Sequence, residues 1–154
     1  MATRLAELPI TGFAREQLLF RLSRLTKEWR HCARNADEDA VHDLRVSLRR
    51  FGEILRAFRR FFPKRAHQQI REEIRQIMNF AGRTRDVDIA RHSFQQAGLS
   101  LNPRLELHLT NERAVASAGL RALLAVGLET DFATRWRRTL ALDSIALPSP
   151  GVDS

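Results

Sequence analysis

The chain has 154 residues, 44% of them hydrophobic, and a net charge of +8 at pH 7, which is enough for one folded domain with its own core. Its single cysteine, Cys32, excludes an internal disulfide and a thiolate metal cluster within one chain. No stretch approaches the roughly 18 apolar residues of a membrane span, and the first residues lack the apolar run of a signal peptide. We therefore expect a cytoplasmic protein without a membrane segment.

Arginine dominates the basic residues, because Lys27 and Lys64 are the only lysines among 26 lysine and arginine residues. The planar guanidinium group binds oxyanions through two parallel hydrogen bonds, which an ammonium group does not do. The composition therefore predicts anionic partners.

The first half of the chain predicts two helices, and no segment shows the period of two that is typical of a strand. Thr11 is a suitable N-cap for a helix that ends near Arg34. The central helix runs from Asn35 to Pro63, and Glu38 stands three residues after Asn35, which is the spacing of a capping box.

The second half of the chain predicts three more helices. Asn102 followed by Pro103 is typical of an N-cap with proline at the first helical position, and Gly98 is a suitable stop for the helix before it. The predicted helices cover about residues 64–97, 103–127 and 131–142.

Short turns between amphipathic helices predict an all-α fold, an antiparallel helical bundle of four long helices plus a shorter C-terminal helix. We assign residues 1–144 to this single domain. Residues 145–154 have the composition of a flexible tail.

The central helix has two chemically opposed faces. Apolar residues at helical spacing form one arc, which packs against other helices. A second, largely cationic row is rotated away from that arc and consists of His42, Arg45, Arg49, Gly52, Arg56 and Arg60. Such a row rises about 5.4 Å per turn, so its guanidinium groups lie along a line that suits an extended polyanion. The alternative is a solvated ion-pair face in which Glu53 neutralises Arg49 and Arg56.

Two motifs stand in order along the chain, VHDLRVSLRR at residues 41–50 and AGRTRDVDI at residues 81–89. Together they resemble the CHAD domain, the conserved histidine α-helical domain. In that family His-x-x-Arg-Val-x-x-Arg-Arg-Leu-Arg is followed by Leu-Gly-x-x-Arg-Asp-x-Asp-Val. The matching residues are His42, Arg45, Val46, Arg49 and Arg50, then Gly82, Arg85, Asp86, Asp88 and Ile89.

The chain departs from the family pattern at two positions. Gly52 stands where the third arginine is expected, and Ala81 replaces the leucine before the glycine. The first departure removes one charge from the row, so we expect it to lower affinity.

The resemblance implies a non-catalytic, all-helical domain that binds inorganic polyphosphate in a basic channel, with phosphate-metabolism enzymes as partners. We interpret Asp86 and Asp88 as structural carboxylates that orient arginines across the bundle. Arg71 and Arg75, one turn apart, either extend the site or face water, and we include Arg75. The residues assigned to polyphosphate are His42, Arg45, Arg49, Arg50, Arg56, Arg75 and Arg85.

Family members are usually twice this long and resemble two four-helix bundles related by an approximate twofold axis, with their basic surfaces around a shared channel. Only one set of motifs is present here, from about Ala40 to Ile89. The resemblance therefore implies one wall of a channel, and we expect a homodimer to restore the enclosure. The alternative is a lone bundle that binds weakly in the open.

His42 followed by Asp43 is also the dipeptide of metal-dependent HD phosphohydrolases, which gives an enzymatic alternative. Such a site needs a second upstream histidine and a downstream aspartate that converge on a metal, and adjacent residues on a helix diverge by about 100°. His31 is the only upstream histidine. We therefore expect no enzyme activity, no cofactor and no metal.

Nucleic-acid binding is the other alternative, because a basic helix can hold the phosphates of DNA. However, the chain has no tyrosine, and the phenylalanines of the central helix lie on its apolar arc. That leaves no aromatic platform on which bases could stack.

Overall fold

The computed structural model describes residues 2–143, so the predicted tail at residues 145–154 lies outside the described part. The helices in that part are α1 (Ala2–Arg34), α2 (Glu38–Ala57), α3 (Lys64–Gln96), α4 (Pro103–Glu129) and α5 (Phe132–Thr139), with a 3-10 turn, η1 (Arg59–Phe61), between α2 and α3. Residues 2–143 contain no strand, which confirms the predicted all-α bundle. None of these helices is both long enough and apolar enough to cross a membrane.

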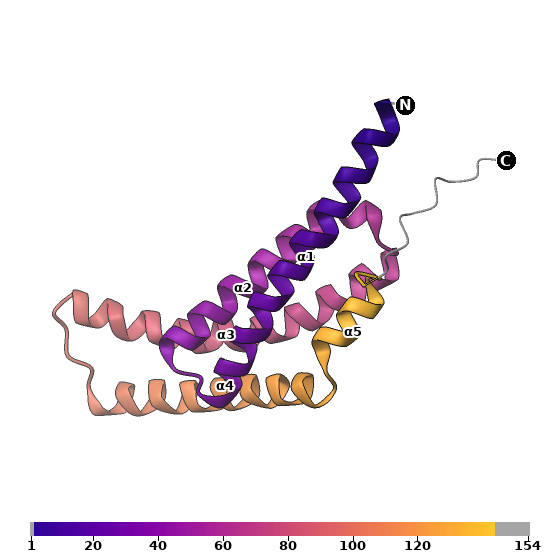
Figure 1. Cartoon of the computed structure of the whole chain (residues 1–154). Helices are drawn as coiled ribbons and strands as arrows, with labels where there is room; N and C mark the ends of the chain where they lie inside the picture. The colour runs from indigo at the N-terminus through magenta and orange to yellow at the C-terminus, as the bar shows by residue number, and fades with distance from the viewer. Residues whose placement is uncertain (1, 144–154) are drawn as a thin grey trace.

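The four long helices close into a bundle (Figure 1). α1 packs on α2, α2 on α3, α3 on α4, and α4 packs back on α1. The short α5 lies against α1 and α4. Grooves lie between α1 and α2 and between α2 and α3.

Aromatic rings attach α5 to the bundle. Phe132 stacks on the fully buried ring of Trp29, with 3.7 Å between ring centroids and 14° between planes. The indole nitrogen of Trp29 donates to the carbonyl of Leu124 at 2.9 Å, and that of Trp136 donates to Glu73 at 3.1 Å. Both buried indole N–H groups thus have acceptors, as burial requires.

Two glycines on α4 allow its close approach to neighbouring helices. A Cβ atom added at Gly119 would overlap the ring of Phe80 on α3, and one added at Gly127 would overlap the ring of Trp29 on α1. Because Gly127 serves this packing, the helix passes through it and ends at Glu129, beyond the predicted end at residue 127.

The predicted start of the first helix is wrong. α1 begins at Ala2 and its backbone continues through Thr11 without a break. The alanines and leucines of the opening residues favour a helix, but Pro9 and Gly12 oppose it, so local propensity does not explain the earlier start.

The predicted capping box of the central helix is also wrong. Asp37 is the N-cap of α2, and its carboxylate accepts a hydrogen bond from the backbone N–H of Ala40 at 2.8 Å. The Asn35 side chain donates to the same carboxylate at 3.3 Å. Glu38 is the first helical residue and turns toward α3 instead of back to the cap.

The central helix ends earlier than predicted. α2 stops at Ala57, and the chain makes the 3-10 turn η1 before Phe62 extends, at φ −124° and ψ 150°. An extended residue before Pro63 is the conformation that proline imposes on its neighbour. Arg60 therefore does not continue the α-helical row.

The later helices begin as predicted. Asn102 accepts from the backbone of Leu105 at 2.7 Å, and Asp131 accepts from the backbone of Thr134 at 3.3 Å. α5 ends at Thr139, three residues before its predicted end at residue 142.

Candidate functional site

A groove of about 330 Å³ runs between α2 and α3, and we call it the α2–α3 groove. Apolar side chains lie at its base and polar side chains line its walls. The base contains Leu48, Leu55, Ile74 and Met78; α2 contributes Arg49, Gly52, Glu53 and Arg56 to the walls, and α3 contributes His67, Arg71 and Arg75.

Helical periodicity and chain direction place these two walls opposite each other. On α3, His67, Arg71 and Arg75 are spaced by four residues and lie on successive turns of one face. Because α3 follows α2 after a short turn and packs antiparallel to it, the end of α2 lies beside the start of α3. Arg56 consequently lies near His67 and Arg71.

The acidic residue in the groove does not neutralise its α2 wall. Glu53 pairs with Arg49 at 3.9 Å, and the two side chains are 63% and 67% exposed, so the pair contributes little. Among the described residues, Arg56 forms no ion pair. Of the two ion pairs in the alternative interpretation, Glu53 therefore forms the one with Arg49 and not the one with Arg56.

The α3 wall has one paired and one unpaired arginine. Arg75 donates two hydrogen bonds to Glu72, at 2.6 and 3.0 Å, and these raise its pKa above the ordinary value. Arg71 has no ion-pair partner in the part of the chain that the structure describes. Arg56 and Arg71 are thus the two wall arginines without a carboxylate.

The pKa of His67 reflects its burial and the positive charges around it. Burial lowers the pKa of His67 below its ordinary 6.5, and the positive charges of Arg71, Arg59 and Arg56 lower it further. No carboxylate opposes them there. The end of the groove around His67 is therefore a region of positive potential, which favours an anion.

Three residues that the sequence assigned to polyphosphate, Arg49, Arg56 and Arg75, line this groove. His42 and Arg45 lie nearer the start of α2 and are not among the lining residues. His42 is exposed, whereas the Nε atom of Arg45 is shielded from solvent and has no hydrogen-bond partner.

Arg50 faces a different groove. It lies between α1 and α2, beside Arg21 and Arg24, in a groove of about 240 Å³. Asp43 lines the same groove. The central helix therefore presents cations on two sides, and the assigned residues do not form one continuous site.

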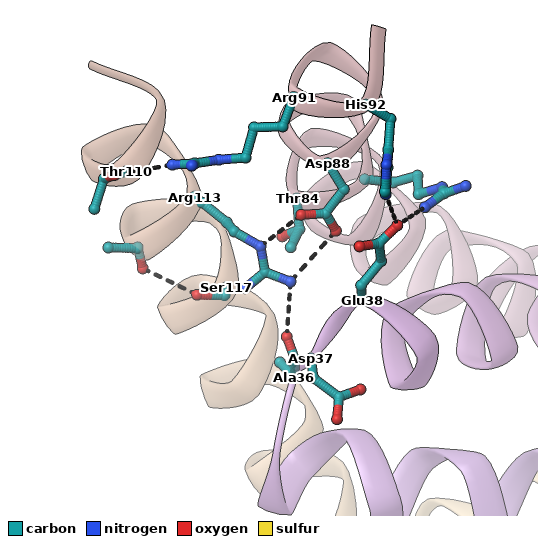
Figure 2. Close-up of polar contacts among 12 residues, drawn as sticks. Ala36, Asp37, Glu38, Thr84, Asp88, Arg91, His92, Thr110, Arg113 and Ser117 are labelled. Atoms are coloured by element: carbon teal, nitrogen blue, oxygen red, sulfur yellow. Dashed lines mark hydrogen bonds and ion pairs between the residues drawn. The ribbon is translucent and has the colours of Figure 1, made fainter. Parts of the chain in front are cut away.

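Arg85 forms an ion pair with Glu38. Its guanidinium donates to Glu38 at 3.1 Å. The exposed ring of His92 contacts the same carboxylate oxygen (Figure 2). The hydrogen bond from His92, together with the charge and hydrogen bond of Arg85, lowers the pKa of Glu38. Arg85 consequently fixes the start of α2 against α3, and a ligand would have to compete with Glu38 for it.

Asp88 on α3 pairs with Arg113 on α4 and not with an arginine of the family motifs. Its buried carboxylate accepts from Arg113 on α4, and the same guanidinium donates to the carbonyl of Ala36 (Figure 2). Asp86 is exposed and forms no ion pair among the described residues. Of the two aspartates interpreted as structural, Asp88 has a partner on another helix.

His67 was missed by sequence reasoning, and Arg71 was noticed but left out of the assigned set. His67 lies outside both family motifs. The available signal was its spacing of four residues from Arg71 and of eight from Arg75, which places all three on one face of α3.

The structure gives no support to a metal-dependent site. His42 and Asp43 diverge, since Asp43 lines the groove with α1. Among residues 2–143, no group of three His, Cys, Asp or Glu side chains is arranged to hold a metal ion. Burial raises the pKa of the Cys32 thiol to about 11, so this thiol stays protonated and unreactive near neutral pH.

The fold and the groove define a helical bundle with a basic surface between two of its helices. The family model of the CHAD domain matches residues 16–152. The chain therefore belongs to the CHAD domain family, as its paired motifs predicted. No curated protein and no solved structure gives a significant match.

Proposed function

We propose that this chain is a cytoplasmic, non-catalytic protein that binds inorganic polyphosphate along the α2–α3 groove. The observation that carries the proposal is the pair Arg56 and Arg71, which face the same groove end beside His67 without a carboxylate partner. Polyphosphate is the anion that the family motifs imply. A chain of phosphates would supply the negative charges that Arg56 and Arg71 lack in the folded chain.

The shape of the groove suits an extended ligand. Arg49 and Arg56 are seven residues apart on α2, so they are separated by about 10 Å along the helix. The start of α3 precedes His67 by about one turn, and Pro63 provides no side-chain cap for its first N–H groups. Uncapped N–H groups and the positive end of the helix dipole favour phosphate oxygens.

Duplex DNA is the competing polyanion. No Phe, Tyr or Trp side chain lines the α2–α3 groove, so a single strand would find no large aromatic platform for its bases, and duplex DNA could be held only through its phosphates. Polyphosphate has no bases and needs only cationic contacts. We therefore expect the groove to hold polyphosphate, a chain of phosphates alone, more tightly than nucleic acid.

The test is a titration of the folded chain with long-chain polyphosphate at low and at moderate salt, followed by competition with duplex DNA. We expect tight binding at low salt that weakens steeply as salt rises, because the contacts join charge to charge. Polyphosphate should displace the DNA. Absence of binding at low salt, or preference for DNA, would overturn the proposal.

A further inference from the structure

A second basic groove lies between α1 and α5, and we call it the α1–α5 groove. Its volume is about 720 Å³, and it shares no lining residue with the α2–α3 groove. Both α1 and α5 contribute to it. Its lining residues are Leu19, Leu22, Ser23, Thr26, Lys27, Arg30, Arg34, Asp131, Ala133, Thr134 and Arg137.

The cations of this groove converge from two elements. Lys27, Arg30 and Arg34 follow one another at spacings of three and four residues, so they form one row on α1. Arg137 joins them from α5. In the part of the chain that the structure describes, the three cations on α1 form no ion pair.

The acid in the groove is already engaged. The Asp131 carboxylate accepts from the backbone N–H of Thr134 at 3.3 Å and from its hydroxyl at 2.7 Å. These two hydrogen bonds, followed by the charges of Arg137 and Arg30, lower the pKa of Asp131. Asp131 caps α5 and Asp143 pairs with Arg137, and two carboxylates cannot neutralise four cations, so the groove keeps a net positive charge.

Arg137 has donor capacity left over. One of its terminal nitrogens donates to the Thr134 hydroxyl at 3.2 Å, and its Nε atom lies 3.6 Å from Asp143 without a hydrogen bond. The hydroxyl of Ser23 is exposed on the same wall. The Nε atom is shielded from solvent, so the terminal nitrogens of Arg137 and the Ser23 hydroxyl are the groups that add hydrogen-bond donors to the cationic row, as phosphate recognition requires.

We propose that the α1–α5 groove binds a compact phosphate ligand with three or more negative charges, independently of the α2–α3 groove. The row from Lys27 to Arg34 covers about 10 Å of helix, which suits a few linked phosphates. Leu19, Leu22 and Ala133 provide apolar surface beside this row. The ligand is either an inorganic oligophosphate or a nucleoside triphosphate, whose organic part would lie on that apolar surface.

The experiment is calorimetric titration of the full chain with tripolyphosphate. We expect two sites in the wild-type chain, one in each groove. The double substitution Arg30→Ala and Arg34→Ala should weaken the α1–α5 site by about a hundredfold, because each arginine makes a charge-assisted contact. One site, in the α2–α3 groove, should remain.

The matched control removes two exposed arginines that line neither groove, Arg104→Ala with Arg138→Ala, and should keep both sites. Far-UV circular dichroism checks that each variant is folded. The proposal is overturned if Arg30→Ala with Arg34→Ala binds tripolyphosphate with the stoichiometry and affinities of the control.

Two further arms separate the α1–α5 site from the proposed polyphosphate site and identify its ligand. The substitutions Arg56→Ala and Arg71→Ala should remove the other site and leave this one, so either site can fail without the other. Titration of that variant with ATP gives the source of the phosphate: tighter binding than tripolyphosphate assigns a nucleoside triphosphate, and weaker binding assigns an inorganic oligophosphate.

Discussion

Arg113 on α4 binds both carboxylate oxygens of Asp88 on α3, with Nε 2.8 Å from Oδ1 and Nη2 3.3 Å from Oδ2. The same guanidinium donates to the Ala36 carbonyl at 3.0 Å. One side chain thus joins α3, α4 and the turn between α1 and α2. The Asp88 side chain is only 6% exposed, so water cannot replace this partner.

Replacing Arg113 with alanine should therefore destabilise the fold. The substitution leaves a buried carboxylate unpaired, which costs about 3 kcal/mol. Urea unfolding gives the change in free energy, with Arg104→Ala as the control because Arg104 is exposed on the same helix. Equal small losses in the two variants would show that the Asp88 pair is not a structural tie.

Binding and stability should both depend on the protonation of His67. The pKa of its imidazole is below 6.5 in the folded chain, so the unfolded chain binds the proton more readily. This contribution to stability is present above about pH 6.5 and decreases as the pH falls toward the folded-state pKa. Bound polyphosphate would reverse the local potential and raise the pKa of His67.

Polyphosphate affinity should consequently increase as the pH falls through the range between the two pKa values of His67. Nuclear magnetic resonance titration of the imidazole with and without polyphosphate measures both values. His67→Gln is the control, because it should remove this part of the pH dependence. A His67 pKa that does not move on ligand addition would place the polymer elsewhere.

Restoring the family arginine at position 52 should strengthen binding. A Cβ atom added at Gly52 would meet no atom within 4 Å, and Gly52 lines the α2–α3 groove. Gly52→Arg therefore has room and adds one charge-assisted contact, which corresponds to about a tenfold gain in polyphosphate affinity. Gly52→Gln, which has a similar helix propensity but no charge, controls for helix propensity. An equal effect of both substitutions would argue against a contact at this position.

Polyphosphate should promote a homodimer. The arginines on both walls of the α2–α3 groove are exposed, so water and salt screen each contact. A net charge of +8 per chain opposes association, so a bridging polymer should stabilise it. Light scattering with and without ligand measures the mass. A monomer in both conditions, with one chain per bound polymer, would exclude the dimer.

Periodicity and motifs predicted the helices and the cationic row because these depend on residues close together in the sequence. The environment of each cation depends on the neighbouring helix. Arg50 and Arg49 are adjacent in sequence but face different grooves, and Arg85 is occupied by Glu38, 47 residues away. A helical wheel gives the direction of a side chain, but it does not say which helix lies there.

The same limitation applies to packing and caps. Gly127 resembled a helix stop, yet its position against Trp29 is set by the contact between α1 and α4. Glu38 had the spacing of a capping box, but its pairing with Arg85 and His92 prevailed. Long-range partners override local signals where a buried or charged group must be satisfied.

The central claim is that polyphosphate occupies the α2–α3 groove, and the most direct test is its affinity for the double variant Arg56→Ala with Arg71→Ala. The comparison is with Arg104→Ala plus Arg138→Ala, which lowers the net charge by the same amount away from the groove. Both are titrated with long-chain polyphosphate at low salt. The account predicts a loss of about a hundredfold for the groove variant and an affinity close to wild type for the control. Equal losses in the two variants would contradict it, because they would show attraction to net charge without a defined site.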